Sequence, residues 1–213
     1  MSTASAVNTQ AGRHASSGSQ AKAPAIATAA ADRAARSGIW LGLFTITMSF
    51  AAFTSALFVR EGTADWGHMV LPRVLYFNTF LLLCSSVSME AARHSLLGES
   101  LIDSQNSRKG TLWLLFTLLL GLAFCAGQYV AWQLLRAQGL YLATNPNSSF
   151  FYVLTFMHVL HLLAGIVVLA YLTGRVVASH TIFRRSLFEN AAIYWHFLGV
   201  LWVYLLVLCR MKL

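Results

Sequence analysis

Five runs of about twenty largely apolar residues limit this chain to very few folds. The runs cover residues 39–59, 70–89, 111–133, 150–173 and 191–208. A run of this length can cross the hydrocarbon core of a bilayer as a helix, in which the backbone satisfies its own hydrogen bonds. None of the runs alternates apolar and polar residues as a strand would. The sequence therefore predicts an all-α integral membrane bundle of five transmembrane helices over residues 38–213.

The composition agrees with a membrane protein. Hydrophobic residues make up 57% of the chain and charged residues only 10%, which is far from the balance of a soluble domain. The net charge of +8 comes from Lys and Arg that lie mainly in short segments between the apolar runs. Basic residues in such segments orient helices in a membrane. We therefore expect no nucleic-acid partner.

Residues 1–37 are rich in Ala, Ser, Thr, Gln and Gly and have almost no large apolar side chains. Such a segment buries too little surface to order itself, so we expect a disordered tail. Ten Lys and Arg lie in this tail and in the connections between the second and third runs and between the fourth and fifth, against five on the opposite side. The excess places the tail and the amino terminus in the cytoplasm.

Three histidines and one glutamate are the candidate functional residues of the membrane region. His158 and His161 lie about one helical turn apart in the fourth run, Glu189 precedes the fifth run, and His196 lies two turns further in. Titratable groups are costly at membrane depth, so they mark either a functional path or a specific packing contact. Two imidazoles at this spacing can share a metal ion, but a stable site needs at least three protein ligands. We expect no metal here, and we expect the imidazoles to bond to neighbouring helices.

Glu189 has two interpretations, and both stay open. The charge count puts it on the cytoplasmic side at the start of a helix, where the helix dipole stabilises a carboxylate. Arg184 and Arg185 precede it in the sequence, and basic residues in this position attract anionic lipid. The carboxylate is therefore also a candidate for collecting protons or for contacting a lipid headgroup. Every other acid is expected in the tail or in a loop.

Small and polar residues at spacings of three and four predict the contacts between helices. In the first run this stripe consists of Gly42, Thr45, Ser49, Ala52 and Ala56, and the main candidates in the later runs are Asn78, Ser85, Gln128, Gly165 and Gly199. The large apolar side chains would then point outward. We expect Trp195 and Trp202 to face lipid or a partner subunit.

The sequence shows no catalytic centre of its own. The GxSxG, P-loop, GxGxxG and HExxH patterns are absent from it, and no pair of carboxylates lies within a run. A proton-coupled transporter would show acidic residues at mid-membrane and interrupted helices. A free-standing transporter or channel is therefore the least favoured function.

Four sequence elements in this order resemble subunit III of the haem-copper terminal oxidases, in its short five-helix form. LPRVLYFNTFLLLCSSVSMEAARHSLL has the family's Asn-Thr, Leu-rich, Ser-pair and Ala-x-His-Ser pattern, and LLLGLAFCAGQY resembles its next helix. The two remaining elements are carried by Phe151, His158, His161 and Gly165, and by Glu189, Ala192, Tyr194, Trp195, His196, Phe197 and Trp202.

The resemblance implies a non-catalytic subunit of a respiratory oxidase in a bacterial plasma membrane. In that family haem and copper belong to subunits I and II, so no cofactor is expected on this chain. Subunit III packs on subunit I, in a complex that also contains subunits II and IV. It binds phospholipid and supports proton uptake and stability of the complex. The resemblance leaves open whether cytochrome c or quinol donates the electrons.

Three departures from the family pattern leave a second function open. The family usually has carboxylates at the positions of Phe50, Ala131 and Gly199 in this chain. Their loss weakens the case for proton support. It keeps open a divergent relative, the subunit-III-like accessory protein of nitric oxide reductase.

Overall fold

Four of the five predicted apolar runs lie within α-helices of the computed structural model, and the run at 70–89 overlaps a helix that begins at Val74. The helices are α1 (Ala4–Glu61), α2 (Val74–Leu97), α3 (Ser104–Ala137), α4 (Pro146–Ser179) and α5 (Arg185–Lys212). The structure describes residues 4–61, 71–97, 104–140, 146–179 and 185–212, and the side chains of most of them from residue 30 onward. All five helices are long and apolar enough to cross a membrane, and the described residues contain no strand. The predicted all-α membrane fold is confirmed.

Most of the helices extend beyond their apolar runs. Local signals explain where α2 begins and where α3 ends. The first turn of α2 is prepared by Pro72, whose carbonyl accepts from the Leu75 amide at 3.1 Å. At the end of α3, Gly139 adopts a φ of 77°. The Gly139 amide donates to the Arg136 carbonyl at 3.0 Å and the Leu140 amide to the Leu135 carbonyl at 3.1 Å. This is the glycine-terminated helix end that satisfies the last free carbonyls.

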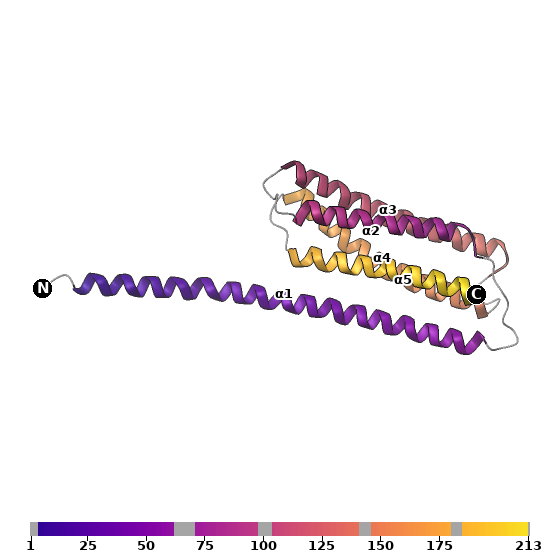
Figure 1. The fold of residues 1–213 in the computed structure, drawn as a ribbon, viewed down its shortest axis with the longest axis horizontal. Helices are drawn as coiled ribbons and strands as arrows, with labels where there is room; N and C mark the ends of the chain where they lie inside the picture. The colour runs from indigo at the N-terminus through magenta and orange to yellow at the C-terminus, as the bar shows by residue number, and fades with distance from the viewer. Residues whose placement is uncertain (1–3, 62–70, 98–103, 141–145, 180–184, 213) are drawn as a thin grey trace. The chain divides into compact units, whose positions relative to one another are not determined.

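Helices α2 to α5 form a closed four-helix arrangement in which α2 packs on α3, α3 on α4, α4 on α5 and α5 back on α2 (Figure 1). They belong to one compact unit, residues 42–213, and residues 1–41 form another. Helix α5 has the largest buried share of the five spans. Helix α5 therefore lies most fully within the contacts between helices.

The last part of α1, from Gly42 onward, packs on this unit through large side chains. Leu43, Phe50 and Leu57 are buried, and the Tyr204 hydroxyl of α5 donates to Thr54 Oγ1 at 3.0 Å. The prediction that the small-residue stripe of α1 faces inward is wrong. Gly42, Thr45, Ala52 and Ala56 are exposed and Ser49 is half-buried. The buried stripe consists of long side chains because they can reach across to α4 and α5.

Helix α1 begins at Ala4, within the segment for which composition predicts a disordered tail. Alanine has the highest intrinsic helix propensity, which explains a helix over Ala-rich residues. A helix without a buried face depends on this propensity alone and is marginal in water. The described residues between Ala30 and Trp40 are mostly exposed. The mobile character of residues 1–37 stays a prediction.

Candidate functional site

Trp195 joins α5 to the three helices around it. Its indole Nε1 donates to Ser85 Oγ of α2 at 3.0 Å. Its ring lies against Gly121 of α3, where an added Cβ would be 2.8 Å from the ring, and against Gly165 of α4, where it would be 3.4 Å away. Trp195 is 1% exposed, so glycine on two helices makes room for one indole.

Trp202 repeats this arrangement about two turns along α5. Its Nε1 donates to Thr79 Oγ1 of α2 at 3.0 Å, and its ring meets Phe124 of α3 edge-on at 4.9 Å between centroids. Trp202 is also 1% exposed. The prediction that Trp195 and Trp202 face lipid or a partner is therefore wrong. Both indoles turn inward because hydroxyls on α2 accept their N–H groups, which cost free energy when buried without an acceptor.

Buried hydroxyls and amides join α2 to α3. Ser88 Oγ and Thr117 Oγ1 lie 2.7 Å apart, and the Asn78 amide donates to Gln128 Oε1 at 3.3 Å. Ser85 Oγ lies 3.4 Å from the Thr117 carbonyl and donates to it while accepting from Trp195. Of the packing residues predicted from the sequence, Asn78, Ser85 and Gln128 are buried in this α2–α3 contact.

The two predicted packing glycines lie where α5 meets its neighbours. Gly165 faces Tyr194 and Trp195, and Gly199 faces Ser86 Oγ, which lies 3.2 Å from the position of an added Cβ. Small residues at such points let membrane helices approach closely.

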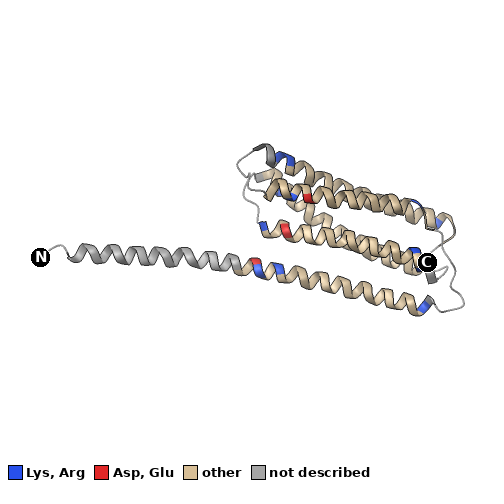
Figure 2. Cartoon of the chain, in the orientation of Figure 1, with Lys and Arg blue, Asp and Glu red and all other residues tan. Residues whose placement is uncertain are grey.

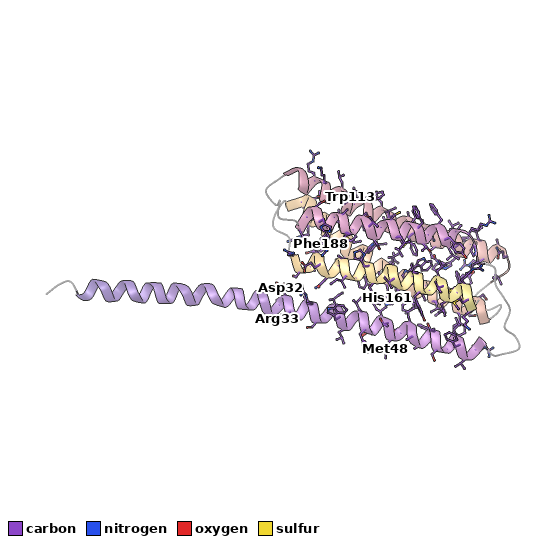
Figure 3. All side chains as sticks on the ribbon, in the orientation of Figure 1. Asp32, Arg33, Met48, Trp113, His161 and Phe188 are labelled. Atoms are coloured by element: carbon purple, nitrogen blue, oxygen red, sulfur yellow. The ribbon has the colours of Figure 1, made fainter. Side chains whose placement is uncertain are left out.

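The two histidines of α4, His158 and His161, contact different residues. His158 is fully buried, with its ring 5.1 Å from Trp202 and 5.9 Å from Phe124 between centroids. His161 Nδ1 lies 2.6 Å from the Met157 carbonyl of its own helix, so this nitrogen carries the proton. Its ring lies 5.9 Å from Phe50 of α1, and Figure 3 shows His161 on the side of the bundle that faces α1. Neither imidazole bonds through its ring to another described helix.

Both ring nitrogens of His158 are buried, and no described residue forms a hydrogen bond with either. An unpaired buried polar group costs free energy, and an apolar group of the same shape does not. His158→Phe should therefore leave the free energy of unfolding unchanged or raise it by up to about 1 kcal/mol. Denaturant unfolding in detergent micelles, followed by circular dichroism, measures the difference.

His161→Phe is the matched control for this prediction, because it removes the bond from Nδ1 to the Met157 carbonyl. It should lower the free energy of unfolding by about 0.6 kcal/mol, an average hydrogen bond within a membrane bundle. A clear loss of stability in His158→Phe would show that the imidazole has a polar partner.

Glu189 is paired within its own helix. Arg185 Nε donates to Glu189 Oε1 at 2.8 Å, and the glutamate side chain is 22% exposed. Arg184, the other basic residue expected near this carboxylate, lies outside the described residues.

A second carboxylate, Glu90, lies at the same end of the bundle, and the prediction that it lies in a loop is wrong. Figure 2 shows acidic residues, in red, on both α2 and α5 near this end. Glu90 is part of α2, which continues to Leu97. Arg93 binds it with two nitrogens, at 2.7 Å and 3.0 Å from Oε1. His94 Nε2 lies 3.2 Å from Oε1, and His196 Nε2 of α5 lies 3.7 Å from Oε2. The spacing Glu-x-x-Arg-His, which places both partners one turn away, was the available signal.

The described residues contain no group of three or more His, Cys, Asp or Glu side chains that could hold a metal ion. His158 is enclosed by aromatic rings and His161 is bonded to its own backbone.

Comparison with known proteins places this helix arrangement in a family. The sequence model of cytochrome c oxidase subunit III matches residues 27–211. The chain belongs to the cytochrome c oxidase subunit III family. It is 32% identical over 176 residues to cytochrome c oxidase subunit 3 of Synechocystis sp., an alignment that covers 82% of this chain and 70% of the relative.

Two eukaryotic relatives agree with this assignment. The chain is 33% identical to cytochrome c oxidase subunit 3 of Emericella nidulans over 172 residues, which cover 77% of this chain and 60% of the relative. It is 32% identical to that of Drosophila yakuba over 172 residues, 78% of this chain and 62% of the relative. The chain thus spans less than two thirds of the length of these two relatives. The resemblance to oxidase subunit III is confirmed, and with it a multi-pass membrane protein.

The three positions that lack the expected acids all lie inside the bundle. Phe50 is 2% exposed beside His161, Ala131 is fully buried, and Gly199 faces Ser86. Each is occupied by an apolar or small residue that fills the helix contact. In this member of the subunit III family, the interior at these positions is apolar.

Proposed function

We propose that the chain is the non-catalytic subunit III of a respiratory haem-copper oxidase that reduces oxygen to water in a bacterial plasma membrane. It packs on the haem-binding subunit I, together with subunits II and IV, and haem and copper reside on those partners. The observation that carries this proposal is the match of the family to residues 27–211, which include all five membrane spans. The excess of Lys and Arg on one side supports a cytoplasmic amino terminus.

One feature of the structure supports association with a larger neighbour. Four small residues of α1, Gly42, Thr45, Ala52 and Ala56, are exposed and are not covered by the other described helices. Nothing in the described chain lies within 4 Å of a Cβ added at Gly42. Small residues favour close packing between membrane helices. The subunit I contact is therefore proposed to include these four residues.

Lipid binding and proton support are proposed for the end of the bundle that carries Glu189. Arg93, Arg108, Lys109, Arg175 and Arg185 all belong to this end, where α2 and α4 finish and α3 and α5 begin. Basic residues next to a membrane attract anionic headgroups. Glu189 then serves as the carboxylate of this surface, held in place by Arg185.

Affinity purification of the chain from its native membrane tests the proposal. We expect a haem-containing partner to purify with it, visible in the reduced-minus-oxidised absorption spectrum, together with bound phospholipid. The chain separated from its partner should show no haem spectrum. Recovery without any haem-containing partner would contradict the proposal, and solute flux through the purified chain in liposomes would favour a transporter.

A second candidate function is supported by the apolar interior at Phe50, Ala131 and Gly199. The chain would then be an accessory protein for nitric oxide reduction, in which proton support is not needed. Deletion of its gene separates the two functions. Impaired aerobic respiration supports the oxidase subunit, and impaired denitrification with normal aerobic growth supports the accessory protein.

A further inference from the structure

We propose that His94, Glu90 and His196 form one proton-binding site across the seam between α2 and α5. The site takes up a proton at the membrane surface and holds it about one turn inside the end of α2. The inference deepens the proposed function and rests on it, because an oxidase consumes protons and this site lies at the end of the bundle for which proton support is proposed.

The geometry places one carboxylate between two imidazoles. His94 Nε2 lies 3.2 Å from Glu90 Oε1, and His196 Nε2 lies 3.7 Å from Oε2. The two histidines therefore approach different oxygens of the same group. His94 comes from the last turn of α2, and His196 comes from α5, 102 positions later in the sequence. Only the packing of α5 on α2 brings them together.

The three side chains of the site differ in how far they are exposed. The His94 side chain is 75% exposed, whereas those of Glu90 and His196 are 37% and 39% exposed. His94 precedes the end of α2 by three residues, and Glu90 lies four residues deeper. Four residues of helix rise about 6 Å. A proton that binds at His94 is thus at the surface, and one that binds at His196 is inside the seam.

Arg93 holds the Glu90 carboxylate in place. It binds Glu90 through two nitrogens, at 2.7 Å and 3.0 Å from Oε1, and its Nε is also 3.0 Å from Oε2. Such a bidentate pair holds a carboxylate in one orientation. The guanidinium cannot release its own proton. The groups left to bind and release a proton are therefore the two imidazoles.

The charge balance favours one bound proton over two. Glu90 and Arg93 together carry no net charge. Protonation of one imidazole therefore gives the four side chains a net charge of +1, and protonation of both would give +2. Groups that interact this closely take up their protons in linked steps that belong to the pair. The bound proton occupies His94 or His196, and it comes from and returns to water or the partner subunit. No other bond is made or broken.

The charged groups nearby do not change the net charge of the site. Glu189 of α5 lies close enough to interact with Arg93 but is itself paired with Arg185. The described ionisable groups of the two neighbouring helices are Arg108, Lys109, Cys125, Tyr129 and Arg136 of α3, and Tyr152, His158, His161, Tyr171 and Arg175 of α4. Among the residues that the structure describes, Arg93, His94 and His196 are the groups within 4.0 Å of the Glu90 carboxylate.

The first test measures proton binding directly. The full-length chain, labelled with 15N-histidine in micelles, is titrated across roughly pH 5 to 8, the range in which imidazoles change charge. We expect the curves of His94 and His196 to be linked, so that His196→Gln alters the curve of His94. Glu90→Gln keeps the shape of the side chain and should uncouple the two curves. Independent curves in the wild type, or linkage that survives Glu90→Gln, would overturn the proposal.

Glu189→Gln is the matched control for this titration. It removes the same charge from the same end of the bundle, but its carboxylate is bound by Arg185 rather than by His94 or His196. The linkage between His94 and His196 should persist in it. If Glu189→Gln abolished the linkage as fully as Glu90→Gln, the general charge of this end would be responsible, and the three-residue site would be rejected.

The second test uses the purified oxidase complex. Glu90→Gln should move the alkaline limb of the pH profile of oxygen reduction toward acid, because the carboxylate that favours a charged imidazole is gone. An unchanged profile with normal subunit content would show that the site does not serve the oxidase. Failure of the chain to purify with a haem partner would instead contradict the proposed function, and the titration result would still stand.

Discussion

Replacing Trp195 with alanine is expected to lower the free energy of unfolding by about 3–5 kcal/mol, the usual cost of removing a large aromatic side chain from a core. The indole fills the space between Gly121 and Gly165 and donates to Ser85 at 3.0 Å. Alanine leaves a cavity where three helices meet and removes a hydrogen bond inside the membrane. Unfolding in mixed micelles with increasing SDS, followed by circular dichroism, measures the loss.

Trp113→Ala is the control for this substitution. Trp113 lies on α3 and is 43% exposed, so its loss should change the free energy of unfolding by no more than about 0.5 kcal/mol. Trp195→Phe keeps a ring in the cavity but removes the N–H and part of the ring system, so it should cost more than the about 1 kcal/mol of a lost hydrogen bond and less than Trp195→Ala. Equal effects of Trp195→Ala and Trp113→Ala would contradict the position of Trp195 at the centre of the bundle.

Gly127→Ala is expected to cost about 1–3 kcal/mol, the range for an added methyl group in a packed interior. An added Cβ at Gly127 would overlap Asn78 Oδ1 of α2. Asn78 is fully buried and donates to Gln128 Oε1 at 3.3 Å. It cannot turn away without breaking this bond and leaving two amides unpaired between α2 and α3. The same unfolding measurement in micelles quantifies the effect.

Gly174→Ala provides the comparison, since nothing lies within 4 Å of a Cβ added at that position of α4. It should stabilise the protein by about 0.5–1 kcal/mol, because alanine forms helix better than glycine. In an Asn78→Ala background the clash is absent, so Gly127→Ala should become much less costly. A cost that is unchanged in this background would place the strain elsewhere.

The membrane spans and the family were predictable from the sequence because they depend on features that need no partner. Twenty apolar residues make a span in any arrangement, and the elements around His158, His161 and Glu189 resemble the family by spacing alone. It was less predictable which face of each helix points into the bundle. Trp195 and Trp202 are large and apolar, which favours lipid, but hydroxyls at Ser85 and Thr79 accept their N–H groups inside the bundle.

The faces of α1 and the role of Glu90 were missed for a related reason. The sequence shows which residues share a face, but the distance to the neighbouring helix decides whether small or long side chains fill the contact. On α1 that distance selects Leu43, Phe50 and Leu57 over the small residues. Glu90 lies beyond the apolar run, so it was assigned to a connection, and its approach to His196 depends on how α5 packs on α2.

The bond between Trp195 and Ser85 joins positions 110 apart in the sequence, and this has a consequence for how the protein is made. Chains leave the ribosome from the amino terminus, and early segments fold before late ones. The hairpin of α2 and α3 can therefore assemble first, through Ser88 and Thr117. The Ser85 hydroxyl accepts the N–H of Trp195 only after α5 has been inserted. Insertion of α5 is the step that closes the ring. A nascent chain arrested before Trp195 emerges should consequently be more sensitive to membrane proteases than one released after α5 is complete.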